Sequence, residues 1–157
     1  MKSVGLVLLL AATFACSSVE GANECTTALY SKLRNAAFNS AFSACMSDPA
    51  GKAALTAIVG NYGCGGYTFT VGDRKCEVGA APFMKCVAGK LGYLKADGSI
   101  DNTKILALYK TWATSDPKCK VAQYDSAVKK CGTTINNYAF LAKADCISTM
   151  ADHPYLV

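Results

Sequence analysis

The residues best suited to chemistry in this sequence are its cysteines, because the chain contains nine of them and only one histidine. Serine and cysteine nucleophiles need a neighbouring base, and the only imidazole here is that of His153, close to the end of the sequence. Residues near a chain end rarely hold the fixed geometry that catalysis requires. We therefore expect a protein that is not an enzyme and that uses no cofactor.

The sequence also lacks the residues that a metal site needs. One histidine and oxidised cysteines cannot provide the nitrogen and thiolate ligands of a zinc site. The stretch Asp97-Gly98-Ser99-Ile100-Asp101 superficially resembles a calcium loop, but Tyr93 and Lys95 occupy the upstream ligand positions and no glutamate closes the site. We expect no metal site.

The state of the cysteines depends on the compartment, and residues 1–21 have the pattern of a secretory signal peptide. Lys2 supplies a positive end, residues 5–12 form an apolar run too short to span a bilayer, and residues 19–21 offer a small-residue cleavage site. Cleavage after residue 21 removes Cys16 and leaves eight cysteines for an oxidising, extracellular destination. The sequence therefore predicts a secreted protein.

The eight remaining cysteines predict up to four disulfides within a single domain formed by residues 22–157. They are Cys25, Cys45, Cys64, Cys76, Cys86, Cys119, Cys131 and Cys146. The short interval between Cys64 and Cys76 favours a local link, although the sequence alone leaves the connectivity open.

The charge of the chain argues against one class of partner. The formal net charge is +5, and the lysines are scattered singly or in pairs rather than clustered. Nucleic-acid binding needs a concentrated basic face that neutralises phosphates. We therefore expect no nucleic-acid partner.

The elements that must position the cysteines are helices, because apolar residues recur at steps of three and four along most of the sequence. Helices are predicted over residues 26–45, 49–60, 82–91, 101–112, 117–131 and 133–146. Between the second and third helices, the glycine-rich segment 60–72 predicts a long loop, in which Tyr67, Phe69 and Val71 alternate like a short strand of a hairpin. The predicted fold is all-α and disulfide-linked, with about six helices around an apolar cavity.

One segment of the sequence resembles a known family. Phe83-Met84-Lys85-Cys86-Val87 is followed by a Lys-Leu-Gly helix end at residues 90–92, by Leu94 and by the turn Asp97-Gly98. Together these residues resemble the third-helix segment of the insect odorant-binding protein family. The resemblance implies an all-helical secreted carrier that encloses a small hydrophobic ligand, of the odorant, pheromone or fatty-acid class, without chemistry.

The same resemblance implies how some of the cysteines pair. The family's second and fifth cysteines, which are bonded to each other, fall on Pro82 and Asn137, so the chain is similar to four-cysteine members. The bonds between the family's first and third cysteines and between its fourth and sixth correspond to Cys45–Cys86 and Cys131–Cys146. The cysteines without a counterpart in the family then leave, by elimination, the pairs Cys64–Cys76 and Cys25–Cys119.

A second resemblance is carried by "CTTALYSKL", residues 25–33, and "NSAFSACMSDPAG", residues 39–51. These stretches are similar to the N-terminal part of oomycete elicitins, which are small, helical, disulfide-bonded and sterol-binding. Both resemblances imply a carrier of hydrophobic molecules. The alternative from another class is a disulfide-rich extracellular interaction or effector protein with a solid core, whose function lies on the loop 60–72.

Inward apolar residues on several predicted helices are the candidate lining of the ligand pocket. They are Phe38, Phe42, Leu55, Ile58, Val87, Leu91, Leu108, Trp112, Tyr124, Tyr138 and Leu141. The polar ends of the tyrosines and of Trp112 could bond the head of a ligand or satisfy a backbone carbonyl. The expected partner is a small hydrophobic molecule, with a receptor or membrane protein as a second candidate, and the tail 153–157 is a candidate pH-sensitive cover of the pocket.

Overall fold

The computed structural model describes residues 23–70 and 72–153, and these form seven helices and no strand. The predicted signal segment, Val71 and the tail after residue 153 lie outside the described residues. The helices are α1 (Glu24–Leu33), α2 (Ala36–Ser47), α3 (Pro49–Gly60), α4 (Arg74–Lys90), α5 (Asn102–Ala113), α6 (Val121–Cys131) and α7 (Phe140–Asp152). The all-α prediction is confirmed, with one helix more than the sequence pattern indicated.

The additional helix arises because residues 26–45 form two helices rather than one. The side-chain oxygen of Asn35 accepts a hydrogen bond from the N–H of Phe38 at 2.9 Å, which caps the start of α2. The N–H of Arg34 donates to the carbonyl of Tyr30 and ends α1. An asparagine that bonds to the backbone in this way competes with helix continuation, although the apolar spacing runs on through it.

Helix α4 begins earlier than the sequence pattern predicted. Pro82 was expected to open a helix at residue 82, but Asp73 caps the helix instead, by accepting from the N–H of Cys76 at 3.0 Å. Pro82 therefore lies inside α4, where it is exposed. On that side water can bond the carbonyl that the missing proline N–H leaves free, so the helix tolerates it.

The last two helices begin later than predicted. Residues 117–120 precede α6, and the N–H of Cys119 turns back to the carbonyl of Asp116 at 3.0 Å. Ile135 and Tyr138 precede α7 in an irregular segment in which Tyr138 has a φ of 56°. Apolar residues of this segment pack inward although the segment is not helical. Apolar periodicity alone cannot distinguish such a segment from a buried helix.

The glycine-rich loop between α3 and α4 contains no strand among its described residues. Gly63 and Gly66 have φ values of 63° and 81°, a conformation that favours glycine. The N–H of Tyr67 donates to the carbonyl of Cys64 at 3.1 Å, which closes a turn just before the alternating residues, and Phe69 has a φ of 64°, outside the extended region. The described residues of the loop therefore do not form the hairpin that the alternation allowed.

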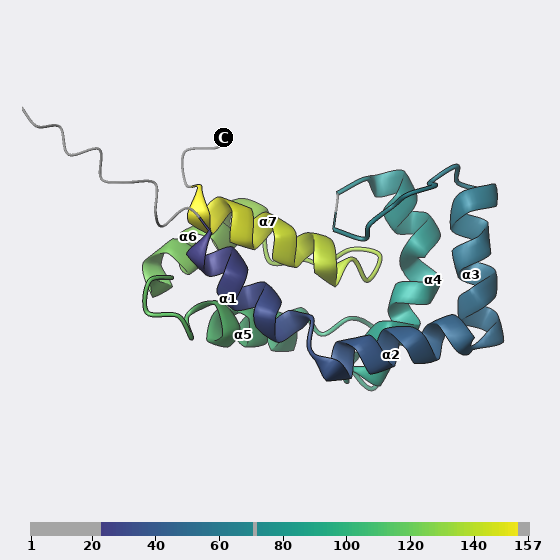
Figure 1. Cartoon of the computed structure of the whole chain (residues 1–157), viewed down its shortest axis with the longest axis horizontal. Helices are drawn as coiled ribbons and strands as arrows, with labels where there is room; N and C mark the ends of the chain where they lie inside the picture. The colour runs from purple at the N-terminus through teal and green to yellow at the C-terminus, as the bar shows by residue number, and fades with distance from the viewer. Residues whose placement is uncertain (1–22, 71, 154–157) are drawn as a thin grey trace, which may run out of the picture.

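The helices pack in two groups (Figure 1). We call α1, α5, α6 and α7 the terminal group and α2, α3 and α4 the central group. The chain passes between them at the α1–α2 turn and again along residues 91–101. One hydrophobic core continues through both groups, and the rings of Tyr93 and Phe140 meet edge to face at 5.5 Å where they join.

Disulfides hold each group together. Cys25–Cys119 and Cys131–Cys146 lie in the terminal group, and Cys45–Cys86 and Cys64–Cys76 lie in the central group. These are the four pairs set out from the sequence, two of them through the family resemblance. Among the described cysteines, none links one group to the other. Four disulfides are typical of proteins that fold in an oxidising compartment.

The two ends of the described chain are joined by a helix cap. Helix α1 has no capping side chain of its own. Instead, both carboxylate oxygens of Asp152, at the end of α7, accept from the N–H groups of Cys25 and Thr26 at 2.9 Å each. A carboxylate is favourable at this position because the first N–H groups of a helix have no partner within the helix. The cap fixes α1 against α7 in the terminal group.

Candidate functional site

Five aromatic rings form a connected cluster in the central group. We call Phe38, Phe42, Tyr67, Phe69 and Phe83 the aromatic cluster. The ring of Phe42 lies at its centre, with centroid distances of 5.7 Å to Phe38, 5.8 Å to Phe69 and 4.9 Å to Phe83. Tyr67 joins through Phe69 at 5.2 Å. The tilted and edge-to-face arrangements are those that aromatic pairs prefer.

Three segments bring these rings together. Helix α2 carries Phe38 and Phe42 one turn apart, so both project from the same face. Phe83 extends from α4 and is fully buried, whereas Phe69 reaches the cluster from the loop and is half-buried. The disulfide Cys64–Cys76 ties the start of that loop to α4, which keeps its aromatic residues beside the cluster.

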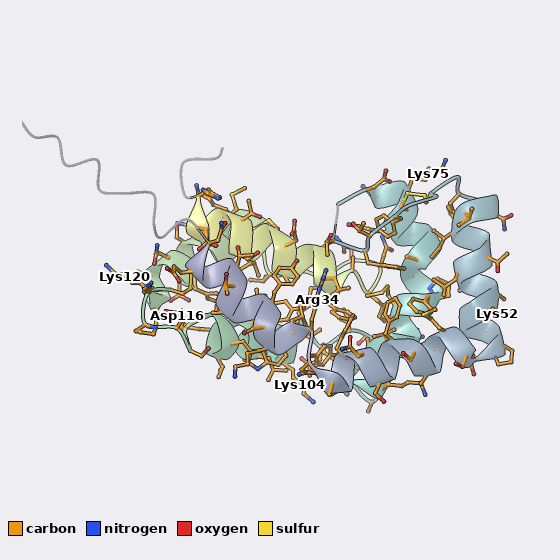
Figure 2. The ribbon with its side chains drawn as sticks, in the orientation of Figure 1. Arg34, Lys52, Lys75, Lys104, Asp116 and Lys120 are labelled. Carbon is orange, nitrogen blue, oxygen red and sulfur yellow. A yellow bond between two sulfur atoms is a disulfide. The ribbon has the colours of Figure 1, made fainter. Side chains whose placement is uncertain are left out.

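Beside the aromatic cluster lies an open groove with a volume of about 420 Å³. Its lining consists of Arg34, Phe38, Asn39, Phe42, Ser43, Thr68, Phe69 and Leu141. Leu141 belongs to α7, so the groove extends between the central group and the terminal group. Figure 2 shows Arg34 between the two groups, at the end of α1.

The structure brings only part of the predicted lining to this groove. Phe38, Phe42 and Leu141 border it, while Arg34 and Phe69 were not among the predicted lining residues. The groove is open to solvent and lies between two helical groups, whereas the sequence led us to expect an enclosed cavity at the centre of one bundle. The reason is the helix break at residues 34–35, which separates the helices into two groups.

The other predicted lining residues lie away from the groove. Ile58, Val87 and Tyr124 are buried in the hydrophobic core, and the remainder are half-buried and pack against it. The remainder are Leu55, Leu91, Leu108, Trp112 and Tyr138.

The tyrosine hydroxyls that could have met a ligand are bonded to the backbone instead. The hydroxyl of Tyr124 donates to the carbonyl of Leu106 at 2.8 Å, and that of Tyr138 donates to the carbonyl of Gly98 at 3.2 Å. The ring of Trp112 packs in a tilted arrangement against that of Tyr109 within the terminal group, with a centroid distance of 6.0 Å. These side chains therefore make contacts within the fold and do not face the groove.

A separate hollow of about 190 Å³, with both polar and apolar residues in its lining, lies between α4 and α7. Glu77 and Lys143 both line it. Burial, followed by the negative charge of Asp73, raises the pKa of Glu77 above its ordinary value. Burial lowers the pKa of Lys143, while Glu77 opposes that change. None of the described residues that line the hollow is aromatic.

Lys143 has a structural task in this region. Its Nζ donates to the carbonyls of Cys131 and Gly132, at 2.6 and 3.1 Å. A cation at this place satisfies carbonyls at the C-terminus of α6. The amine is therefore occupied by the helix end and is a poor candidate for ligand contact.

Arg34 is the single ionisable side chain among the described residues that line the groove. Its guanidinium carbon lies 5.3 Å from the centroid of the Tyr30 ring. Within residues 23–70 and 72–153, no carboxylate comes within 4.0 Å of it. The hydroxyl of Tyr30 donates to Asp145 at 3.2 Å, so this carboxylate is bonded elsewhere.

Tyr67 is neutral at physiological pH. Burial, followed by the charges of Glu77 and Asp73, raises the pKa of Tyr67 to about 12.

Across the part of the chain that the structure describes, no group of three or more His, Cys, Asp or Glu side chains could hold a metal ion.

Fold and groove together define an all-α, disulfide-linked protein with an aromatic groove open to solvent. Comparison with known proteins finds no family model, no curated protein and no solved structure that matches the chain. None of the described helices is both long enough and apolar enough to cross a membrane.

Proposed function

We propose that the protein is a secreted carrier that binds a small hydrophobic molecule in the groove beside the aromatic cluster. The observation that carries the proposal is the groove itself, with rings of Phe38, Phe42 and Phe69 along about 420 Å³ of open space. This volume lies within the range of ligand pockets, roughly 300–1,000 Å³. A bound apolar molecule removes ring surface from water, which is favourable.

Two further features support a secreted carrier. The pattern of residues 1–21 is typical of a signal peptide, and four disulfides suit an extracellular protein. The segment 83–101, which resembles odorant-binding proteins, contributes Phe83 to the aromatic cluster. Under this proposal Thr68 and Phe69 of the loop form one wall of the ligand site rather than part of a separate interaction surface.

A fluorescent naphthylamine probe tests the proposal. We expect saturable binding at micromolar protein and displacement by long-chain alcohols, fatty acids or sterols. Asn39 is exposed and lines the groove, so Asn39→Trp fills the space without disturbing the core, and it should weaken probe binding by about tenfold or more. Phe42→Ala should weaken binding for the complementary reason, the loss of ring contact.

Two control variants accompany this test. Asn39→Ala removes the side chain without filling the groove and should bind the probe as the wild type does. Asn61→Trp adds the same indole at an exposed position that does not line the groove, and it should also bind normally. Absence of saturable binding in the wild type, or equal binding by Asn39→Trp, would contradict the proposed function.

A further inference from the structure

The charge of the groove lining restricts the ligand beyond its hydrophobicity. Asn39, Ser43 and Thr68 are neutral, and among residues 23–70 and 72–153 neither aspartate nor glutamate lines the groove. Of the lining residues that the structure describes, Arg34 alone is charged, and it is exposed. The groove therefore offers one positive charge next to a surface of aromatic rings.

Arg34 is available to a ligand because its guanidinium packs against an aromatic ring and has no described carboxylate partner. The face of Tyr30 positions it at 5.3 Å, a contact that leaves its N–H donors free to bond. No described carboxylate forms an ion pair with it, and no described acceptor bonds to its side chain. It lies between the C-terminus of α1 and the N-terminus of α2, so the opposite charges of the two helix ends offset each other.

We propose that the ligand is an amphiphile with a single carboxylate head. This inference rests on the proposed function and names the ligand class of the same site. The carboxylate binds the guanidinium of Arg34 at the α1–α2 turn, and the hydrocarbon tail lies along Phe38 and Phe42 towards Phe69 and Leu141. Arginine suits this role because its planar fork can donate two parallel hydrogen bonds to a carboxylate and stays charged at every physiological pH.

The test compares three ligands that share a tail and differ only in the head: dodecanoate, dodecanol and dodecylamine. Each displaces the fluorescent probe from the wild-type protein, below the concentration at which micelles form. Dodecanoate should bind about tenfold more tightly than dodecanol, since a charge-assisted hydrogen bond at an exposed site contributes modestly, and dodecylamine should bind least tightly. The preference for dodecanoate should disappear as the carboxylic acid is protonated, below about pH 4 to 5.

Variants at Arg34 assign the preference to the guanidinium. Arg34→Gln should lose the preference for dodecanoate over dodecanol, and Arg34→Lys should retain part of that preference. Lys52→Gln is the matched control for charge, because Lys52 lies on α3 at the far end of the molecule (Figure 2). It should leave all three affinities unchanged.

The outcomes separate this inference from the function on which it rests. If none of the three ligands displaces the probe, the proposed function fails, and the inference fails with it. If dodecanol binds but dodecanoate is not preferred, or if the preference survives in Arg34→Gln, the groove binds hydrophobic molecules and only the carboxylate assignment is overturned.

Discussion

Individual residues decide where this chain differs from the regular pattern of its sequence. Asn35 is the clearest case, because one side-chain hydrogen bond to the N–H of Phe38 divides a continuous apolar stripe into two helices. The break leaves Arg34 outside both helices and at the border of the groove. A single capping residue thus places Arg34, the only charged side chain among the described lining residues, at the candidate site.

Glu77 gives a residue-scale prediction about pH. Its pKa is raised by burial and by Asp73, while Lys143 and Arg74 oppose the rise. The folded state therefore binds the proton of Glu77 more tightly than the unfolded chain does. This protonation stabilises the fold below pH 4.5, the ordinary pKa of a glutamate, and the stabilisation is lost as the pH rises through the pKa of Glu77 in the folded state. Glu77→Gln should therefore match the wild type in stability in acid and exceed it at pH 7 by at most about 1 kcal/mol, since solvent screens the site.

Urea denaturation of the wild type and Glu77→Gln at pH 4 and pH 7 measures this difference. A glutamine variant that is less stable than the wild type at pH 7 would show that the ionised carboxylate stabilises the fold, contrary to the account.

At the scale of elements, the tight turn between α2 and α3 restricts which residues can occupy two of its positions. Asp48 ends α2 and also caps α3, where its carboxylate accepts from the N–H groups of Ala50 and Gly51 at 3.0 and 3.2 Å. The corner is so tight that a Cβ on Gly51 would overlap the carbonyl oxygen of Cys45. The absence of a side chain at Gly51 is therefore what allows α3 to turn back from α2.

Gly51→Ala tests the importance of this corner, with Gly60→Ala as the control in the same helix. Gly51→Ala should lower the free energy of unfolding by at least about 2 kcal/mol, because the backbone must move to admit the methyl group. Gly60 has no atom near its would-be Cβ, so Gly60→Ala should leave stability unchanged or raise it by up to about 1 kcal/mol. Equal stabilities for the two variants would show that the corner is not tight.

The sequence predicted the elements better than their boundaries. Apolar spacing located the helices correctly wherever one face is buried, as along α5, where Ile105 and Tyr109 are fully buried. It failed at Pro82, because an exposed proline within a helix resembles one at its start. It also failed at Ile135, which is buried in an irregular segment whose shape depends on distant contacts such as the bond from its N–H to Asn102.

The candidate site was predictable only in part, for a related reason. Phe38 and Phe42 share a helical face, and the sequence identified both. The loop residue Phe69 lies in an alternation that is typical of a strand and gave no indication of the groove, and Arg34 lies within a stretch that the apolar spacing predicts as one continuous helix. Which helices face each other across the groove depends on the three-dimensional arrangement of the two groups, and local sequence does not encode that arrangement directly.

At the scale of the whole molecule, we expect two of the disulfides to differ in their effects: Cys25–Cys119 mainly stabilises the fold, and Cys64–Cys76 mainly supports ligand binding. Cys25–Cys119 closes a segment of 94 residues and Cys64–Cys76 one of 12. On loop-closure entropy the first stabilises by about 4 to 5 kcal/mol and the second by about 3 kcal/mol. Only the second holds the loop that carries Phe69 to the groove.

Replacing each pair by alanines should therefore give opposite rankings in two measurements. The variant without Cys25–Cys119 should lose more stability in urea denaturation but keep its affinity for the probe at low temperature, where it remains folded. The variant without Cys64–Cys76 should lose less stability and more affinity, by about fivefold or more. The same ranking in both measurements would mean that the loop does not contribute to the site.

The central claim is that a hydrophobic molecule binds beside the aromatic cluster, and ring resonances report on this most directly. Dodecanol titrated into protein with labelled aromatic rings should cause saturable chemical-shift changes at Phe38, Phe42 and Phe69, which line the groove. Trp112, which packs in the terminal group, should not respond. Shifts confined to Trp112 and its surroundings, or no saturable shift at any ring, would contradict the account.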